Sequence, residues 1–377
     1  MRGKKLSVGV RVALTIFALT VFVTTVCATG EKGLPSFNPD GDGISSYASL
    51  VFDAAGNLYG TTQYGGAYNY GSVFEVIPKA GGGWKEKLLH SFNGKDGYQT
   101  FAGVIFDTAG NLYGTTISEG AHGGGTAFEL IPKAGGGWRE KVLHNFGLGE
   151  DGFQPYGGLI IDASGNLYGT TTFVGGYNNK YGTVFELTPE ASGGWKETVL
   201  HYFNQNGKDG IWPNASLSLG AGGNLYGTTP LGGAYGSGTV FELTPKAGGG
   251  WIEKILHSFH NNGADGIVPQ AGVIIDGSGN LYGTTQGGGV YGKGAVFELT
   301  PKTDGGWTEK VLRSFNGKDG LEVYGGLVID GSGNLYGTTT DGGAYQYNGN
   351  AFELTPTAGG GWKETVLHNF SQNTKDG

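Results

Sequence analysis

The sequence predicts an all-β protein, specifically a six-bladed β-propeller, and three observations support this fold class. The motif GNLYGTT occurs six times at intervals of about 55 residues. Tryptophan keeps the same spacing, at Trp84, Trp138, Trp195, Trp251, Trp307 and Trp362. Glycine supplies 78 of 377 residues without a G-X-Y period, beside 12% aromatic residues. This composition indicates many tight turns between short strands that bury apolar area, rather than collagen or disorder.

Each repeat contains four strand-like runs. In the third copy they are GGLIID at 157–162, NLYGTT at 166–171, TVFELTP at 183–189 and WKETVLHYF at 195–203, all bounded by turn-forming residues. Four short strands per unit are typical of a propeller, in which each sheet packs against the next. The first strand is the most apolar and is expected near the axis, and the fourth is expected at the rim. A linear β-solenoid is the alternative architecture.

Partial repeats flank the six complete ones. Residues 34–43, LPSFNPDGDG, and residues 367–377, LHNFSQNTKDG, both copy the end of the fourth strand and the loop after it. A closed set of six blades and the loss of further blades or of a C-terminal anchor are both compatible with this pattern.

The N-terminus has the pattern of a secretory signal peptide over residues 1–28, with the propeller domain over 29–377. Basic residues precede an apolar run at 12–26, and cleavage is expected after Ala28. Alternatives are a lipoprotein signal using Cys27 and an uncleaved anchor. Cleavage removes the one cysteine and four basic residues from a chain of net charge −8. An exported, acidic protein without a membrane span is therefore expected in the extracellular space, at the cell surface or in the periplasm, and no nucleic-acid partner is expected.

Several repeated polar residues have a structural interpretation. Asp53 and its counterparts precede a glycine by three, which predicts a turn, and the fourth copy has Gly220 instead. Two glutamates per repeat, represented by Glu75 and Glu86, suggest cross-strand pairs with lysines such as Lys87. Histidine ends the fourth strand of five copies, but Arg313 replaces it in one, which favours a shared role as hydrogen-bond donor over a metal ligand or base. No catalytic residues, metal ligands or cofactor are predicted.

Two loops of each repeat are candidates for ligand binding. Because strands of a blade alternate in direction, the loops after the second and fourth strands share one face. The first loop places a ring at Tyr68, His122, Tyr177, Tyr235, Tyr291 and Tyr345. The second has an Asp-Gly pair at Asp96, Asp151, Asp209, Asp265 and Asp319. Aromatic rings beside polar groups suit a sugar, whereas the alternative is that these rings only cover blade junctions. Bound Ca²⁺ is a weaker alternative, because only NPDGDG at 38–43 approaches the spacing of a calcium loop.

The repeat as a whole resembles the GloVer tandem repeat of exported bacterial proteins. The resemblance lies in the sequence motifs GNLYGTT, GTVFELTP and GGGWKETVLHSFNG, and it covers roughly residues 34–377. It implies export and repeat architecture but no reaction, and proteins of that family often carry C-terminal surface anchors, a pattern from which residues 367–377 are expected to depart. We expect a monomeric, non-enzymatic propeller that binds a glycan or a surface protein. The alternatives are a polysaccharide lyase or hydrolase whose site lies where the symmetry breaks, as at Glu119, His122, Trp212 or Gly220, and a purely structural surface protein.

Overall fold

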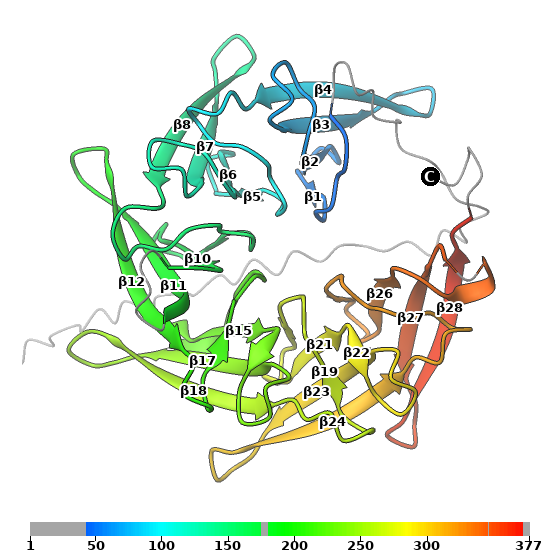
Figure 1. Cartoon of the computed structure of the whole chain (residues 1–377). Helices are drawn as coiled ribbons and strands as arrows, with labels where there is room; N and C mark the ends of the chain where they lie inside the picture. Colours follow the sequence, from blue (N-terminus) through cyan, green and yellow to red (C-terminus); the bar gives the residue numbers. More distant parts are fainter. Residues whose placement is uncertain (1–42, 175–179, 346, 372–377) are drawn as a thin grey trace, which may run out of the picture. The chain divides into compact units, whose positions relative to one another are not determined.

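The computed structural model describes residues 43–174, 180–345 and 347–371. They belong to one compact unit, Leu34–Gly377, that holds six four-stranded antiparallel sheets with their strands in chain order. The predicted all-β, six-bladed propeller is therefore confirmed (Figure 1). The expected signal peptide, most of the 38–43 loop and Tyr177 lie outside the described residues.

The four strands of a blade are called A to D in chain order. Blades 1 to 3 consist of β1 (Val51–Phe52), β2 (Leu58–Thr62), β3 (Ser72–Pro78) and β4 (Trp84–Ser91); β5 (Ile105–Phe106), β6 (Leu112–Thr116), β7 (Thr126–Pro132) and β8 (Trp138–Asn145); and β9 (Ile160–Ile161), β10 (Leu167–Thr171), β11 (Lys180–Pro189) and β12 (Trp195–Asn204). Blades 4 to 6 consist of β14 (Ser218–Leu219), β15 (Leu225–Thr229), β17 (Thr239–Pro245) and β18 (Trp251–Ser258); β20 (Ile274–Ile275), β21 (Leu281–Thr285), β23 (Ala295–Pro301) and β24 (Trp307–Ser314); and β25 (Val328–Ile329), β26 (Leu335–Thr339), β27 (Asn350–Pro356) and β28 (Trp362–Asn369).

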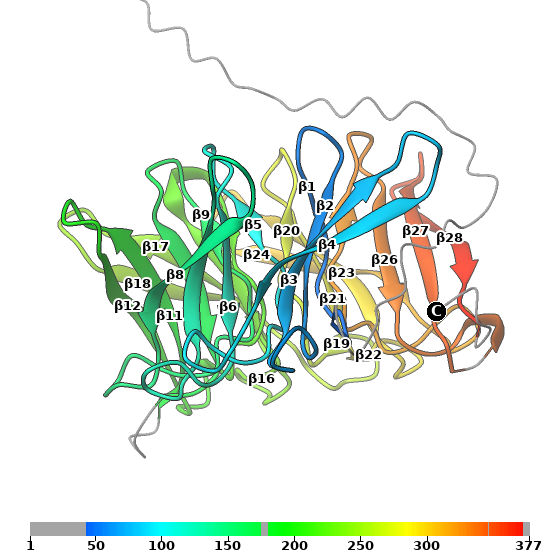
Figure 2. The ribbon, with the colours of Figure 1, turned by 90° about the horizontal axis from the view of Figure 1, so that it is seen from above.

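Short extra strands join the two kinds of loop that were expected to share a face. β13 (Gly210–Ile211) pairs with β16 (Leu231–Gly232), and β19 (Gly266–Ile267) pairs with β22 (Gly287–Gly288). Each pair links a D–A loop to the following B–C loop, and Figure 2 shows β16, β19 and β22 at the same edge of the sheets. The described residues also contain two 3-10 turns, η1 (Ala221–Gly223) and η2 (Gly343–Tyr345).

Strand A lies at the axis, as its apolar sequence predicts, but it is shorter than expected. Only Ile160–Ile161 of the expected 157–162 run is paired. Segments entering and forming strand A in all six blades line one central cavity of about 430 Å³. Six segments of the one chain approach each other closely near the axis, which explains their small residues. A Cβ added to Gly157 would lie 2.5 Å from the carbonyl oxygen of Ala215 in the next blade.

The motif GNLYGTT fills the junctions between blades. At the first junction, Tyr59 and Phe92 of blade 1 pack with Leu112 and Phe128 of blade 2, and all four are nearly inaccessible to solvent. Such large buried rings dominate the packing energy of a core. Equivalent clusters form at the next four junctions. The motif is therefore a scaffold element, which explains why it can be repeated in every blade.

The tyrosine of the motif also closes a polar network. The Tyr59 hydroxyl donates to Glu75 Oε1 at 3.0 Å and lies 3.1 Å from Asp53 Oδ2. Asp53 Oδ1 accepts the backbone N–H groups of Ala55 and Asn57, both at 2.9 Å, which confirms the predicted turn. Glu75 also pairs with Lys87 at 3.0 Å, as expected. Lys141, the counterpart of Lys87 in blade 2, instead donates to the Gly193 carbonyl of blade 3.

The second glycine of the motif is fixed by steric contact, which gives a test of the packing. A Cβ on Gly169 would lie 2.6 Å from Phe185 Cζ and 3.1 Å from Leu159 Cδ2. We expect Gly169→Ala to lower the free energy of unfolding by about 1–3 kcal/mol through overpacking. Gly277→Ala is the matched control because nothing lies within 4 Å of its Cβ position. Equal chemical-denaturation midpoints for the two variants would contradict this packing.

Candidate functional site

The predicted loop rings lie on the surface. Tyr68, Tyr235, Tyr291 and Tyr345 are 60%, 57%, 59% and 56% exposed, and His122 is also exposed. Tyr235 stacks on His260 with ring centroids 4.0 Å apart, and both line a cleft of about 680 Å³ between blades 4 and 5. Their exposure is compatible with ligand binding, but no observation tests this role, which stays a prediction.

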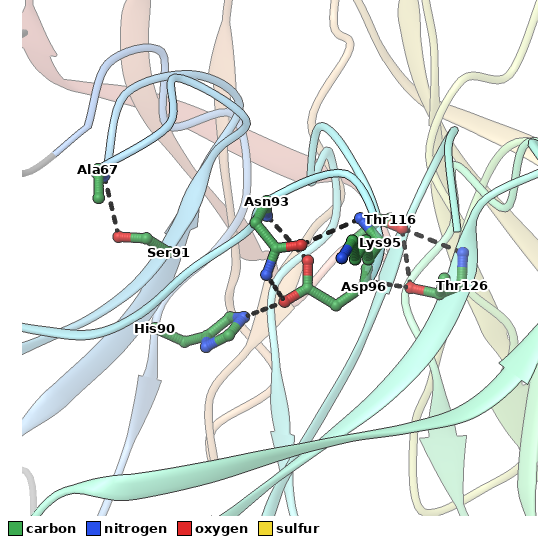
Figure 3. Close-up of polar contacts among 8 residues, drawn as sticks. All are labelled: Ala67, His90, Ser91, Asn93, Lys95, Asp96, Thr116 and Thr126. Carbon is green, nitrogen blue, oxygen red and sulfur yellow. Dashed lines mark hydrogen bonds and ion pairs between the residues drawn. The ribbon is translucent and has the colours of Figure 1, made fainter. Parts of the chain in front are cut away.

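Four of the five predicted aspartates are buried within their D–A loops, and Asp151 is partly buried. Asp96 Oδ1 accepts the Asn93 N–H at 2.8 Å, while Oδ2 accepts Asn93 Nδ2 at 2.9 Å and lies 3.0 Å from His90 Nε2 (Figure 3). Asp209, Asp265 and Asp319 are likewise buried, and Asp151 makes the equivalent contact with His144 at 3.1 Å. The D–A loop uses these carboxylates as internal acceptors, which leaves little of them available to a ligand.

The same aspartates belong to clusters at the blade junctions. Each histidine–aspartate pair of one blade faces the glutamate of the W-x-E segment in the next, as His90 and Asp96 face Glu140. Burial is the largest cause that raises the pKa of Glu140 to about 7, with opposing effects of His90 and Asp96. The same cause raises the pKa of Glu197, Glu309 and Glu364 to about 7 and that of Glu253 to about 8.

The blade 5–6 junction shows which chemical group the cluster requires at the histidine position. Arg313 replaces histidine in blade 5 and forms ion pairs with both Asp319 and Glu364, so the position supplies a hydrogen-bond donor to carboxylates, as predicted. At the blade 3–4 junction, the ligand atoms of His201, Asp209 and Glu253 lie within 4.8 Å of one another. At the equivalent place in the blade 5–6 junction, Arg313 makes the contacts with the two carboxylates instead.

The raised glutamate pKa values predict how stability depends on pH. A carboxyl group that holds its proton more tightly when folded contributes stability below about pH 4.5, and this contribution is lost as pH rises through about 7. We expect Glu140→Gln to leave stability unchanged near pH 4.5 and to increase it at pH 8 by on the order of 1 kcal/mol, because the side chain is only half-buried. Urea unfolding at the two pH values measures this, and a variant that loses stability at pH 8 would contradict the assignment.

A second site, which we call the axial pocket, lies beside the central cavity where blades 3, 4 and 5 meet. It has a volume of about 370 Å³, and it is lined by Tyr156, Thr172, Phe173, Trp212, Asn214, Pro230, Leu231, Val268 and Gln270. Tyr156, Asn214 and Gln270 also line the central cavity, so the two spaces adjoin. Phe173 and Trp212 stand with ring centroids 6.0 Å apart. None of the described residues that line the axial pocket is charged.

Amide groups supply the polar part of the axial pocket. Asn214 Nδ2 donates to Gln270 Oε1 at 2.7 Å, and Gln270 Nε2 donates to Gln286 Oε1 at 3.2 Å. Two buried atoms are left over: Trp212 Nε1 and Asn214 Oδ1 have no hydrogen-bond partner among the described residues. A buried donor and a buried acceptor without partners are costly in a folded protein.

Trp212 has an unusual backbone conformation that the fold imposes. Its φ is 62°, and the equivalent Ser45, Gln99, Gln154 and Val268 have φ of 57–60°. The Trp212 N–H donates to the Tyr181 carbonyl of the preceding blade at 2.8 Å, which holds the loop in this left-handed region. Sequence reasoning had marked Trp212 as a break in symmetry. It missed Phe173, Asn214 and Gln270, because their convergence depends on three separate repeats.

Comparison with solved structures found distant similarities to several proteins. The luciferin-regenerating enzyme is 13% identical, with 85% of this chain and 92% of that chain covered and a TM-score of 0.47. A putative oxidoreductase (glucose dehydrogenase) from Thermus thermophilus is 16% identical, with 89% and 99% covered and a TM-score of 0.47. An endo-arabinanase from Bacillus licheniformis is 12% identical, with 69% and 95% covered and a TM-score of 0.37. These distant similarities do not assign an activity.

Sequence comparisons are more specific about the repeat itself. No curated protein matches the chain. Within the described residues, no helix has the length and apolar character needed to cross a membrane. The model of the Gloeobacter/Verrucomicrobia repeat matches residues 15–205, 141–305 and 179–377. With these matches extending over nearly the whole sequence, the chain belongs to the Gloeobacter/Verrucomicrobia repeat family.

Proposed function

We propose that the protein is an exported, non-enzymatic scaffold that binds a neutral glycan in the axial pocket. The observation that supports this most is the pair of unpartnered buried atoms, Trp212 Nε1 and Asn214 Oδ1, placed among aromatic rings. Sugars present apolar faces that pack on aromatic rings and hydroxyl groups that both donate and accept hydrogen bonds. The pocket offers both kinds of contact within one cavity.

The chemistry of the pocket supports binding over hydrolysis. Cleavage of a glycosidic bond typically requires two carboxyl groups flanking the bond, one of them acting as an acid. The described residues lining the axial pocket include no carboxylate or histidine. The same lack of charge favours a neutral ligand over an acidic polysaccharide, which would need a cationic partner in a site of this polarity.

A glycan array probed with the chain 29–377 tests the proposal. We expect a set of related neutral oligosaccharides to be retained by the native chain and lost by Trp212→Gln, which carries the residue found at the equivalent Gln99 and Gln154. Gln99→Ala is the matched control, because it changes the same loop position in blade 2. If no glycan is retained, or if Trp212→Gln retains the same glycans with equal affinity, the axial pocket is not a sugar site.

A further inference from the structure

The five junctions between consecutive blades repeat the same contacts. These contacts define which partner groups each face of a blade needs from its neighbour. The motif tyrosine of one blade meets the tryptophan of the next edge-on, with ring centroids 6.2–6.4 Å apart. A motif threonine donates to a backbone carbonyl of the next blade at 2.9–3.2 Å. The five donors are Thr61, Thr115, Thr170, Thr228 and Thr284, and all are 0–2% exposed.

The corresponding face of blade 6 does not make these contacts. Thr338, the sixth equivalent threonine, is exposed and donates to no carbonyl among the described residues. Val328 and Leu367 are 66% and 53% exposed, whereas Leu143, which is equivalent to Leu367, is 8% exposed. This apolar face, defined by Val328, Tyr336, Thr338 and Leu367, is called the trailing face.

Blade 1 has the complementary exposed face. Phe52 is 67% exposed, while its counterparts Phe106, Ile161 and Ile329 are half-buried against the preceding blade. Trp84 makes no edge-on contact with Tyr336 among the described residues, although every other junction has this pair. Phe52 and Trp84 define the leading face. Blades 1 and 6 stand at the two ends of the chain of blades, in blue and in orange to red (Figure 1).

We propose that a further copy of this repeat, carried by a partner protein, docks between the trailing face of blade 6 and the leading face of blade 1. The five internal junctions are an established interface, and both exposed faces continue it. A single four-stranded repeat has one face of each kind, so it buries both at once. A second copy of this chain could cover both faces only by closing a ring of twelve blades, six from each copy, whereas a single repeat covers both faces at once. The second copy is therefore the poorer occupant.

Titration of the chain 29–377 with a synthetic polypeptide of residues 266–319 tests this inference. This segment contains the four strands of blade 5. We expect saturable binding of one polypeptide per chain, a rise in Tm of roughly 5 °C and slower hydrogen exchange at the Thr338 amide. In the native chain, Leu281 and Phe297 pack against the preceding blade, so in the docked polypeptide they would face blade 6. A control polypeptide with Leu281→Asp and Phe297→Asp places charges on this face and should not bind.

Three other outcomes would overturn the proposal. Formation of dimers or larger assemblies by the chain alone, seen by light scattering, would assign both faces to a second copy. Quantitative disulfide formation within one chain of the Phe52→Cys, Val328→Cys variant would show that blades 6 and 1 close on each other. Because a free repeat is marginal in water, residues 266–319 are also tested after Gly377 of the same chain. An appended repeat that leaves Tm unchanged and remains open to protease would equally overturn the proposal.

Discussion

Replacing Tyr59 by alanine should cost about 3 kcal/mol or more of unfolding free energy. The ring is 5% exposed and packs edge-on against Phe106, with centroids 5.0 Å apart, so its loss leaves a cavity at the blade 1–2 junction. The substitution also removes the hydroxyl shared by Asp53 and Glu75. Guanidinium unfolding curves of the two proteins measure the difference.

Two further variants separate packing from polarity and surface from core. Tyr59→Phe keeps the ring and removes the hydroxyl that donates to Glu75 Oε1. It should cost about 1–3 kcal/mol, the penalty for leaving a buried acceptor unpaired. Tyr235→Ala removes a ring that is 57% exposed and should change stability by less than about 1 kcal/mol. If Tyr235→Ala unfolds the protein as readily as Tyr59→Ala, the loop ring is part of the packing, and its predicted role in ligand binding loses its support.

The second large effect is expected on binding. Trp212→Gln should weaken glycan affinity by about 10- to 100-fold, because stacking on one aromatic ring contributes about 1–3 kcal/mol. Stability should change little, since Gln99 and Gln154 hold the same conformation with φ of 60° and 59°. Isothermal titration with the retained oligosaccharide measures the loss.

A second substitution tests the amide side of the same pocket. Asn214→Tyr introduces the residue found at the equivalent Tyr47, Tyr156 and Tyr324, which fills the space and removes the free Oδ1 acceptor. We expect it to abolish binding while thermal unfolding stays cooperative. Unaltered affinity in both variants would place the ligand elsewhere.

The sequence predicted those features of the fold that the repeat itself encodes. Asp162 and Gly165 specified a turn locally, and the structure confirms it with an Asn166 N–H to Asp162 Oδ1 bond of 2.9 Å. The boundaries of strands B and D followed from apolar runs between turn residues. Strand A was overestimated because its small residues serve close approach at the axis, where the chain is near its neighbours without being paired to them.

The proposed site was harder to predict because it is formed by residues that the repeats do not share. Six equivalent rings, five tyrosines and His122, drew attention to the B–C loops. The axial pocket instead combines Phe173, Trp212 and Gln270 from three different blades. The predicted role of the aspartates in ligand binding stays a prediction, but their burial was missed for a physical reason. Asp96 lies on the predicted face, but loop N–H groups and His90 need its carboxylate as an acceptor, so burial was not apparent from its sequence context.

A crystal structure of the chain with the oligosaccharide retained on the array tests the central claim most directly. The account predicts a sugar ring packed against Trp212 in the axial pocket, with hydroxyl groups within hydrogen-bond distance of Trp212 Nε1 and Asn214 Oδ1. A sugar bound only at the B–C loops, for example on Tyr235, with only water in the axial pocket, would contradict it.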